Sequence, residues 1–188
     1  MPTINLPIFS LPIFLLPRGA TRLRIFEARY LKMVSLAMKN QGFVILSHDR
    51  DEKAEPMSVG SWVEIINFDQ GGDGVLLIDV CCKCLVDIKA ITQDTDKLHH
   101  GDVTAKIHWP DINLDKTTDK LAKSLSKVFI ENAELGALYP KQHFDQGDWV
   151  VARWLELIPV KLAEKTLFVD KDSYSQAKEL LQSIILSE

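Results

Sequence analysis

Apolar residues follow two different spacings along the chain. Up to about residue 110 they form short runs or alternate with polar residues, which is typical of β-strands. These patterns predict strands over residues 43–46, 59–70, 75–91 and 103–109, with a polar surface loop over 47–58 and a turn over 94–102. From residue 115 onward the apolar positions recur every three or four residues, which is typical of amphipathic helices. This spacing predicts helices over residues 117–135 and 148–158, and a last helix after Ser173.

A segment interrupted by prolines precedes these elements. Residues 6–16 read LPIFSLPIFLL, and each proline removes a backbone donor and favours extended geometry. The segment is therefore predicted to be an edge strand or an extended arm. Its apolar side chains belong either to the core or to an exposed surface that could bind an extended peptide, and the sequence leaves both readings open.

Residues 25–30, IFEARY, are predicted to open the first helix. Phe26, Tyr30 and Val34 recur at helical spacing, and Gly42 is placed to end the helix. We expect Phe26 and Tyr30 to anchor this helix in the core. Replacing either residue with alanine would then cost about 3–5 kcal/mol.

Two short motifs predict a turn and a helix start. Residues 71–74, GGDG, supply glycines for a tight hairpin between two strands. Residues 173–176, SYSQ, have the form of a capping box ahead of the last helix.

Two stretches resemble the amino-terminal, substrate-binding domain of Lon proteases, a domain that also occurs as a stand-alone protein. The first is residues 6–34, LPIFSLPIFLLPRGATRLRIFEARYLKMV, and the second is the strand pair over residues 59–80. The resemblance implies an α+β fold. Residues 1–114 would form a PUA-like β pseudobarrel with one inserted helix, and residues 115–188 a small helical bundle. The family-motif residues, mainly structural in this reading, are Ile25, Phe26, Glu27, Arg29 and Tyr30.

The resemblance also implies a function. The chain would be a non-enzymatic module that recognises unfolded polypeptides or a protein partner, without the ATPase and protease domains of full-length Lon. Independently, the sequence has no G-x-x-x-x-G-K-[ST] loop for phosphates and no serine in a sharp, glycine-flanked turn. We therefore expect no catalytic residues, no bound metal and no cofactor.

Charge and composition narrow the class of protein further. Of the 188 residues, 46% are hydrophobic and 26% charged, which is typical of a folded globular chain. The net charge is −4, and the parts before and after residue 114 carry 12 basic against 14 acidic and 10 against 12 residues. Neither part is a basic module, so nucleic acid is not an expected partner. RNA binding by the PUA-like part remains the alternative, because Arg18, Arg22, Arg24 and Arg29 concentrate positive charge in one stretch.

The chain's ends and cysteines point to a cytoplasmic protein. The first ten residues lack a basic region, and prolines break their apolar run, which argues against a signal peptide or a membrane segment. Three cysteines, Cys81, Cys82 and Cys84, are too few and too close for a disulfide framework. Reduced thiols buried in a strand are the simpler reading. A thiol- or metal-dependent protein that uses them together with His99 or His100 is a further alternative.

Candidate partner-binding residues come from the arm and the arginines that follow it. The arginines either contact an anionic partner or form ion pairs that fix the arm against the first helix. The oligomeric state is not predicted. The candidates are Phe9, Ile13, Phe14, Arg18, Arg22 and Arg24.

Overall fold

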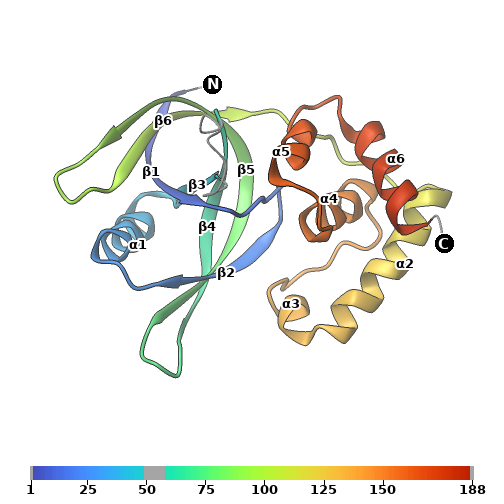
Figure 1. Ribbon diagram of the computed structural model, residues 1–188, viewed down its shortest axis with the longest axis horizontal. Coiled ribbons are helices and arrows are strands. Elements are labelled where there is room, and N and C mark those ends of the chain that lie inside the picture. The colour runs from blue at the N-terminus through green and yellow to red at the C-terminus, as the bar shows by residue number, and fades with distance from the viewer. Residues whose placement is uncertain (1, 49–57, 187–188) are drawn as a thin grey trace. The chain divides into compact units, whose positions relative to one another are not determined.

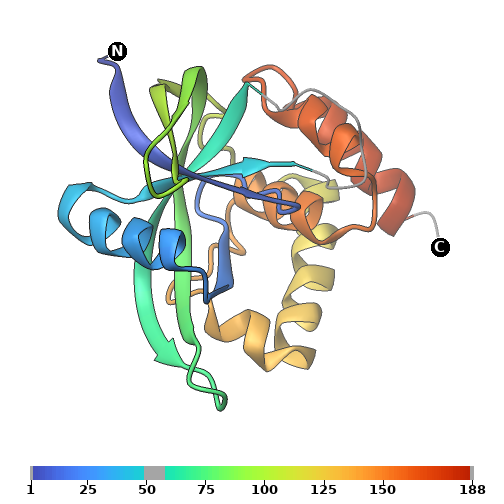
Figure 2. The same ribbon diagram turned by 60° about the vertical axis from the view of Figure 1, so that its left-hand side comes forward.

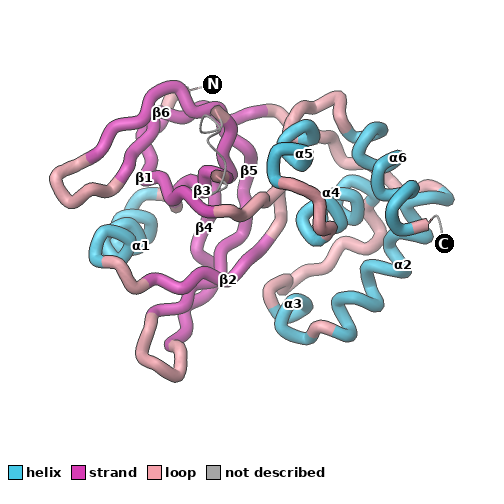
Figure 3. The backbone as a smooth tube through the Cα atoms, in the orientation of Figure 1, coloured by secondary structure: helices cyan, strands magenta, loops and turns pink. Residues whose placement is uncertain are grey.

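The computed structural model describes residues 2–48 and 58–186. The surface loop predicted over residues 47–58 therefore lies largely outside the described residues. The chain divides into two compact units, Met1–Lys106 and Ile107–Glu188. Strands dominate the first unit and helices the second (Figure 3). The division falls between Lys106 and Ile107, whereas the change from strand to helix pattern predicts a boundary after Leu114.

The first unit is a ring of strands that carries one helix (Figure 1). Its described elements are β1 (Ile4–Leu11), β2 (Ala20–Ile25), α1 (Ala28–Asn40), β3 (Phe43–Ser47), β4 (Val59–Gln70), β5 (Leu76–Gln93) and β6 (His99–Lys106). The sheet order is β2-β5-β4-β3-β1-β6, and a further pairing of β5 with β6 closes the ring and leaves β2 outside it. The long β5 makes this closure possible, because one of its edges pairs with β4 while the other pairs with β2 over residues 76–81 and then with β6 over residues 85–93. The predicted α+β pseudobarrel with an inserted helix is confirmed, although the ring is not a regular barrel.

The prediction that the proline-rich segment is an edge strand is wrong. β1 lies inside the sheet, antiparallel to β6 over Ile4 to Ile8 and parallel to β3 over Ile8 to Leu11. The strand changes partner at Ile8, so each half is paired on one side at a time. Pro7 belongs to the half that pairs only with β6, which explains how a residue without a backbone donor is accommodated in an interior strand.

The first helix begins later than the sequence predicts, and Phe26 is not its anchor. Ile25 is the last residue of β2 and is buried opposite Leu76 of β5. The side chain of Phe26 is 70% exposed, and α1 starts at Ala28. The helix is held instead by its buried residues Met33, Val34 and Ala37, with Tyr30 packed partly against the same core.

Gly42 ends the helix region as predicted, and it does so by close packing. Gln41 and Gly42 both have positive φ angles, 87° and 96°, and the Gly42 N–H donates to the carbonyl oxygen of Ala37. A Cβ atom at Gly42 would lie 2.0 Å from the carbonyl oxygen of Val63 in β4. Glycine is therefore required both by the backbone angle and by the close approach of β4 to this segment.

Other strands match the sequence pattern in part. β3 is buried along its whole length, as its apolar run predicts. β6, however, begins at His99 and ends at Lys106, so the preceding turn is shorter than predicted and the strand does not reach Trp109. Of the three glycines in the β4–β5 turn, only Gly74 has a positive φ, at 80°.

The second unit consists of short helices around one apolar helix. Its described elements are α2 (Lys116–Glu131), α3 (Ala133–Ala137), α4 (Gly147–Leu157), α5 (Leu162–Lys165), the 3₁₀ turn η1 (Thr166–Phe168) and α6 (Tyr174–Ile185). α4 is buried almost all round, which confirms it as the central helix. The single helix predicted over residues 117–135 is two, because the Asn132 side chain accepts the Leu135 N–H and starts α3.

The capping box lies at α2 rather than at α6. Asp115 Oδ1 accepts the N–H groups of Thr117 and Thr118, and Thr118 Oγ1 accepts the Asp115 N–H in return. At α6 the Ser173 side chain makes no cap hydrogen bond; its hydroxyl donates to the Asp170 carbonyl oxygen. The capping-box prediction for residues 173–176 is therefore wrong.

Candidate functional site

Strands β2, β5 and β4 form a blade with two chemically different faces. Directly paired residues lie on the same face, and the faces alternate along each strand. One row joins Arg22, Asp79 and Asn67, whereas the next joins Leu23, Ile78 and Phe68. One face is therefore charged and the other apolar.

The apolar face continues from the core to the surface. Leu23 and Ile78 are buried in the cluster beneath α1, whereas Phe68, in the same row, is 45% exposed. Phe26 lies just beyond the last residue of β2, Ile25, which pairs with Leu76 at the same end of the blade, so Phe26 is not itself part of a paired row. The β4–β5 hairpin projects past the first turn of α1 (Figures 1 and 2).

The first unit exposes further large apolar side chains on neighbouring elements. Leu31 and Met38 are seven residues apart on α1, so they lie on the same flank of that helix two turns apart. Ile66 is exposed at an irregularity of β4. We call the set the α1–β4 apolar surface: Phe26, Leu31, Met38, Ile66 and Phe68.

Ion pairs organise the charged face of the blade. Arg22 donates from Nε to Asp79 Oδ1 at 2.7 Å and from Nη2 to Asp79 Oδ2 at 3.0 Å, and its Nη1 lies 3.5 Å from Asp69. Asn67 donates to the same carboxylate. The hydrogen bond from Arg22 lowers the pKa of Asp79, against the opposing effect of burial. Arg24 Nη2 lies 2.6 Å from Asp73 Oδ2 and lowers the pKa of Asp73 in the same way.

The other two arginines also have local roles. Arg29 Nε donates to Glu27 at 2.8 Å, and its guanidinium lies 4.6 Å from the centre of the Tyr30 ring. Arg18 has a positive φ of 67°, and its backbone N–H donates to the Cys82 carbonyl oxygen. These contacts support the reading in which the arginines fix local structure.

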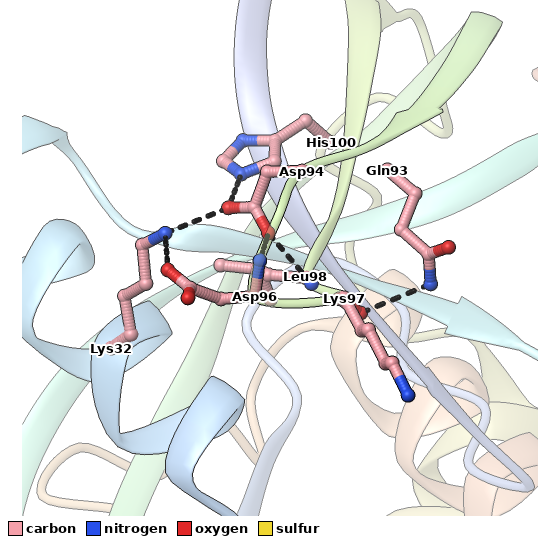
Figure 4. Close-up of polar contacts among 7 residues, drawn as sticks. All are labelled: Lys32, Gln93, Asp94, Asp96, Lys97, Leu98 and His100. Atoms are coloured by element: carbon pink, nitrogen blue, oxygen red, sulfur yellow. Dashed lines mark hydrogen bonds and ion pairs between the residues drawn. The ribbon is translucent and has the colours of Figure 1, made fainter.

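A carboxylate in the β5–β6 turn holds α1 in place (Figure 4). Asp94 Oδ1 accepts the N–H groups of Asp96 and Leu98, and Asp94 Oδ2 accepts Lys32 Nζ at 2.9 Å. His100 Nε2 lies 3.3 Å from the same oxygen, and Lys32 Nζ also contacts Asp96. The Lys32 hydrogen bond is the main reason that the pKa of Asp94 is lowered. Leu98 is fully buried in the cluster beneath α1, so the β5–β6 turn and α1 pack on the same core.

The predicted partner-binding residues are not brought together. Phe9 and Phe14 are buried and Ile13 is half-buried, and the tilted rings of Phe9 and Tyr30 have centroids 4.0 Å apart. Arg22 and Arg24 share one face of the blade, but that face is the charged one. The described surface therefore offers a partner little of the two phenylalanines, and the binding role of all six candidates stays a prediction.

The exposed aromatic residues are what sequence reasoning missed. The helical spacing between Phe26 and Tyr30 predicts that Phe26 lies in the core, and the strand pattern predicts Phe68 only as one residue of a strand. A signal for Phe68 existed, since it alternates with the polar Asn67 and Asp69. Its exposure, however, depends on how far the hairpin reaches beyond the core, which no local pattern encodes.

The three cysteines lie close together in β5 and form no disulfide. Cys82 is buried in the core, and Cys81 and Cys84 are partly buried free thiols. Burial is the main cause that raises the pKa of Cys84, which keeps it protonated at neutral pH and disfavours the thiol-enzyme alternative. Over residues 2–48 and 58–186, no group of three or more His, Cys, Asp or Glu side chains is placed to hold a metal ion. The same ranges contain no helix that is long and apolar enough to cross a membrane.

Comparisons with known proteins agree with this fold. A family model described as the ATP-dependent protease La (LON) substrate-binding domain matches residues 5–186. The chain is similar to the crystal structure of a Lon N-terminal domain protein from Xanthomonas campestris, with 25% identity and a TM-score of 0.73, over 96% of this chain and 98% of that one. It has the fold of the N-terminal domain of a Mycobacterium avium complex Lon protease, with 12% identity, a TM-score of 0.64, and coverage of 98% and 100%. No curated protein matches the sequence.

Proposed function

The chain belongs to the family of Lon substrate-binding domains, and from this we propose that it binds exposed apolar segments of unfolded polypeptides through the α1–β4 apolar surface. As a member of that family it is a substrate-binding module, and no protease or ATPase domain is found in it. We further propose that it acts without catalysis or cofactor, in the cytoplasm, where its free cysteines would stay reduced.

One observation carries the location of the site. Phe26 is 70% exposed although it lies beside the core, and Phe68 extends the buried apolar row of the blade to the surface. Removing one such aromatic side chain from water contributes about 1.5–3 kcal/mol of favourable free energy. Contacts with a few of these side chains would therefore be enough to bind a polypeptide segment. Large apolar side chains exposed on neighbouring elements mark interaction sites when they form one continuous surface, and this continuity is part of the proposal.

The contacts of the arginines favour a polypeptide over RNA. Arg22 and Arg24 are each engaged by carboxylates at 2.7 Å and 2.6 Å, so part of their charge is already neutralised. Binding through apolar side chains would survive added salt, whereas phosphate contacts are lost steeply as salt rises. Salt dependence therefore separates the two alternatives.

A binding titration tests the proposal. The 188-residue chain is titrated with a fluorescently labelled, permanently unfolded polypeptide and with its folded counterpart, each at low and moderate salt. We expect saturable binding of the unfolded form that persists at moderate salt. The double variant Phe26→Ser and Phe68→Ser is expected to weaken it at least about tenfold, since two apolar contacts are lost.

The matched control changes an exposed apolar residue of the other unit. Leu167 is 67% exposed, and Leu167→Ser is expected to leave the affinity unchanged. Equal binding of the folded and unfolded forms, or equal loss in the control, would overturn the assignment of the surface. Absence of binding by the wild-type chain would overturn the proposed function itself.

A further inference from the structure

Four lysines form one row along the exposed face of α2. Lys116, Lys120, Lys123 and Lys127 are separated by four, three and four residues, and all are exposed. The helix rises 1.5 Å per residue, so the row spans about 16 Å. The opposite face of α2 holds its buried residues. We call these four residues the α2 lysine row.

The acids nearest the row do not neutralise it. Asp119 Oδ2 lies 2.7 Å from Lys123 Nζ. Asp115, at the start of the helix, is engaged by Lys178 Nζ at 2.6 Å and by the capping N–H groups. In the described part of the chain the other three lysines of the row have no ion pair. Most of the positive charge of the row is therefore uncompensated.

The row also opposes the stability of its own helix. The N-terminal end of a helix carries a partial positive charge, which disfavours a cation such as Lys116 at the first helical position. Like charges four residues apart on a helix repel each other, and the row contains two such pairs. Residues that lower the stability of their own helix, with no other contact in the fold to offset the loss, are typical of functional surfaces.

We infer that the α2 lysine row is a second contact surface, which binds acidic stretches of an extended polypeptide. An extended chain carries alternate side chains on one side about 6.7 Å apart. Lysines four residues apart lie about 6 Å apart along the helix, so successive carboxylates of such a chain match the row. The inference rests on the proposed function for the kind of partner, but it uses charge instead of apolar contacts.

The composition of the exposed face favours a polypeptide over single-stranded nucleic acid. Proteins that bind single strands stack the bases on aromatic side chains, and the exposed residues of α2 include none. The row ends beside Ile130, which is 77% exposed. An aliphatic side chain at this place suits contact with a side chain of a bound peptide, whereas a phosphate backbone would gain nothing from it.

The test uses a ligand that lacks apolar side chains. The 188-residue chain is titrated with a labelled, unstructured peptide of alternating glutamate and serine, with the glutamine–serine equivalent, and with oligouridine. We expect the glutamate peptide to bind at low salt and to weaken as salt rises. The triple variant Lys116→Gln, Lys120→Gln and Lys127→Gln is expected to bind it about tenfold more weakly, because three charge contacts are lost.

A second triple variant separates the row from net charge. Lys39→Gln, Lys89→Gln and Lys141→Gln remove the same charge at exposed positions elsewhere, and we expect them to leave the affinity within about twofold of wild type. Equal loss in both variants, no binding of the glutamate peptide, or tighter binding of oligouridine through the row would each overturn the inference. None of these results affects binding of the apolar unfolded polypeptide, which tests the proposed function separately.

Discussion

At the scale of single residues, exposure separates Phe26 from Tyr30. Sequence spacing assigns both to the core, but Phe26 is 70% exposed while Tyr30 packs on Phe9 and the cluster beneath α1. Phe26→Ala is therefore expected to change the free energy of unfolding by less than about 0.5 kcal/mol, as for most surface positions. Tyr30→Ala is expected to cost about 2 kcal/mol, since a half-buried ring loses part of what a core aromatic loses. Urea unfolding of both variants measures the difference, and equal losses would contradict the exposed position of Phe26.

Gly42 is the glycine whose replacement is expected to be most damaging. A methyl group there would meet the Val63 carbonyl oxygen at 2.0 Å, and the φ of 96° disfavours any side chain. Gly42→Ala is expected to destabilise the chain by at least about 2 kcal/mol. Gly72→Ala is the control, because nothing lies within 4 Å of a Cβ at that position, and it is expected to be neutral. A neutral Gly42→Ala in urea unfolding would refute the close approach of the two segments.

At the scale of elements, the sequence predicts which segments form strands or helices better than it predicts their ends. β3, β4, β5 and α4 follow from continuous or alternating apolar patterns that the structure satisfies. The predicted start of α1 is too early because residues 23–30 fit both the two-residue repeat of a strand and the 3.6-residue repeat of a helix. Leu23 and Ile25 alternate with polar residues, whereas Phe26 and Tyr30 are one helical turn apart. Pairing of β2 with β5, some fifty residues away, decides between them. Neither this pairing nor the partner change of β1 can be read from local spacing, so the exposed surface around Phe26 could not be predicted.

The charged cap of α2 gives a pH prediction. The hydrogen bond from Lys178, followed by that from the Thr118 backbone, lowers the pKa of Asp115 to about 2. An unfolded aspartate titrates near pH 3.9, so the unfolded chain binds more protons below that pH. The stabilisation from the ionised Asp115 is therefore present above about pH 4 and lost as the pH falls from about 4 to about 2.

The variant Asp115→Asn isolates this charge, because asparagine also caps helices well. We expect its free energy of unfolding, measured in urea at neutral pH, to be lower than that of wild type. The difference between the two should shrink towards pH 3, because wild type loses the Asp115–Lys178 ion pair there. Asp172→Asn, which changes an exposed carboxylate of the same unit, is expected to show no such convergence. If the difference in unfolding free energy between Asp115→Asn and wild type stayed constant with pH, the ion pair would not contribute to stability.

At the scale of the whole molecule, the boundary between the two units makes a prediction about fragments. Trp109 Nε1 donates to Ser173 Oγ at 3.0 Å, and the Ile112 N–H donates to Asp148 Oδ1 at 2.9 Å. Both donors precede residue 115, yet both acceptors lie in the helical unit. The fragment 107–188 is therefore expected to unfold cooperatively in urea, whereas 115–188 loses these contacts and unfolds at a lower midpoint. Equal midpoints would favour the sequence-based boundary after Leu114.

The most direct test of the central claim is an amide hydrogen-exchange footprint of the 188-residue chain, with and without a saturating unfolded polypeptide. The α1–β4 apolar surface predicts slower exchange on binding at residues 26–38 and 66–76, where partner contacts would restrict opening of the helix and hairpin. Residues 4–11 of β1 are expected to change little, since their apolar side chains are already buried. Protection confined to the helical unit, or to β1, would contradict the account and move the binding surface elsewhere.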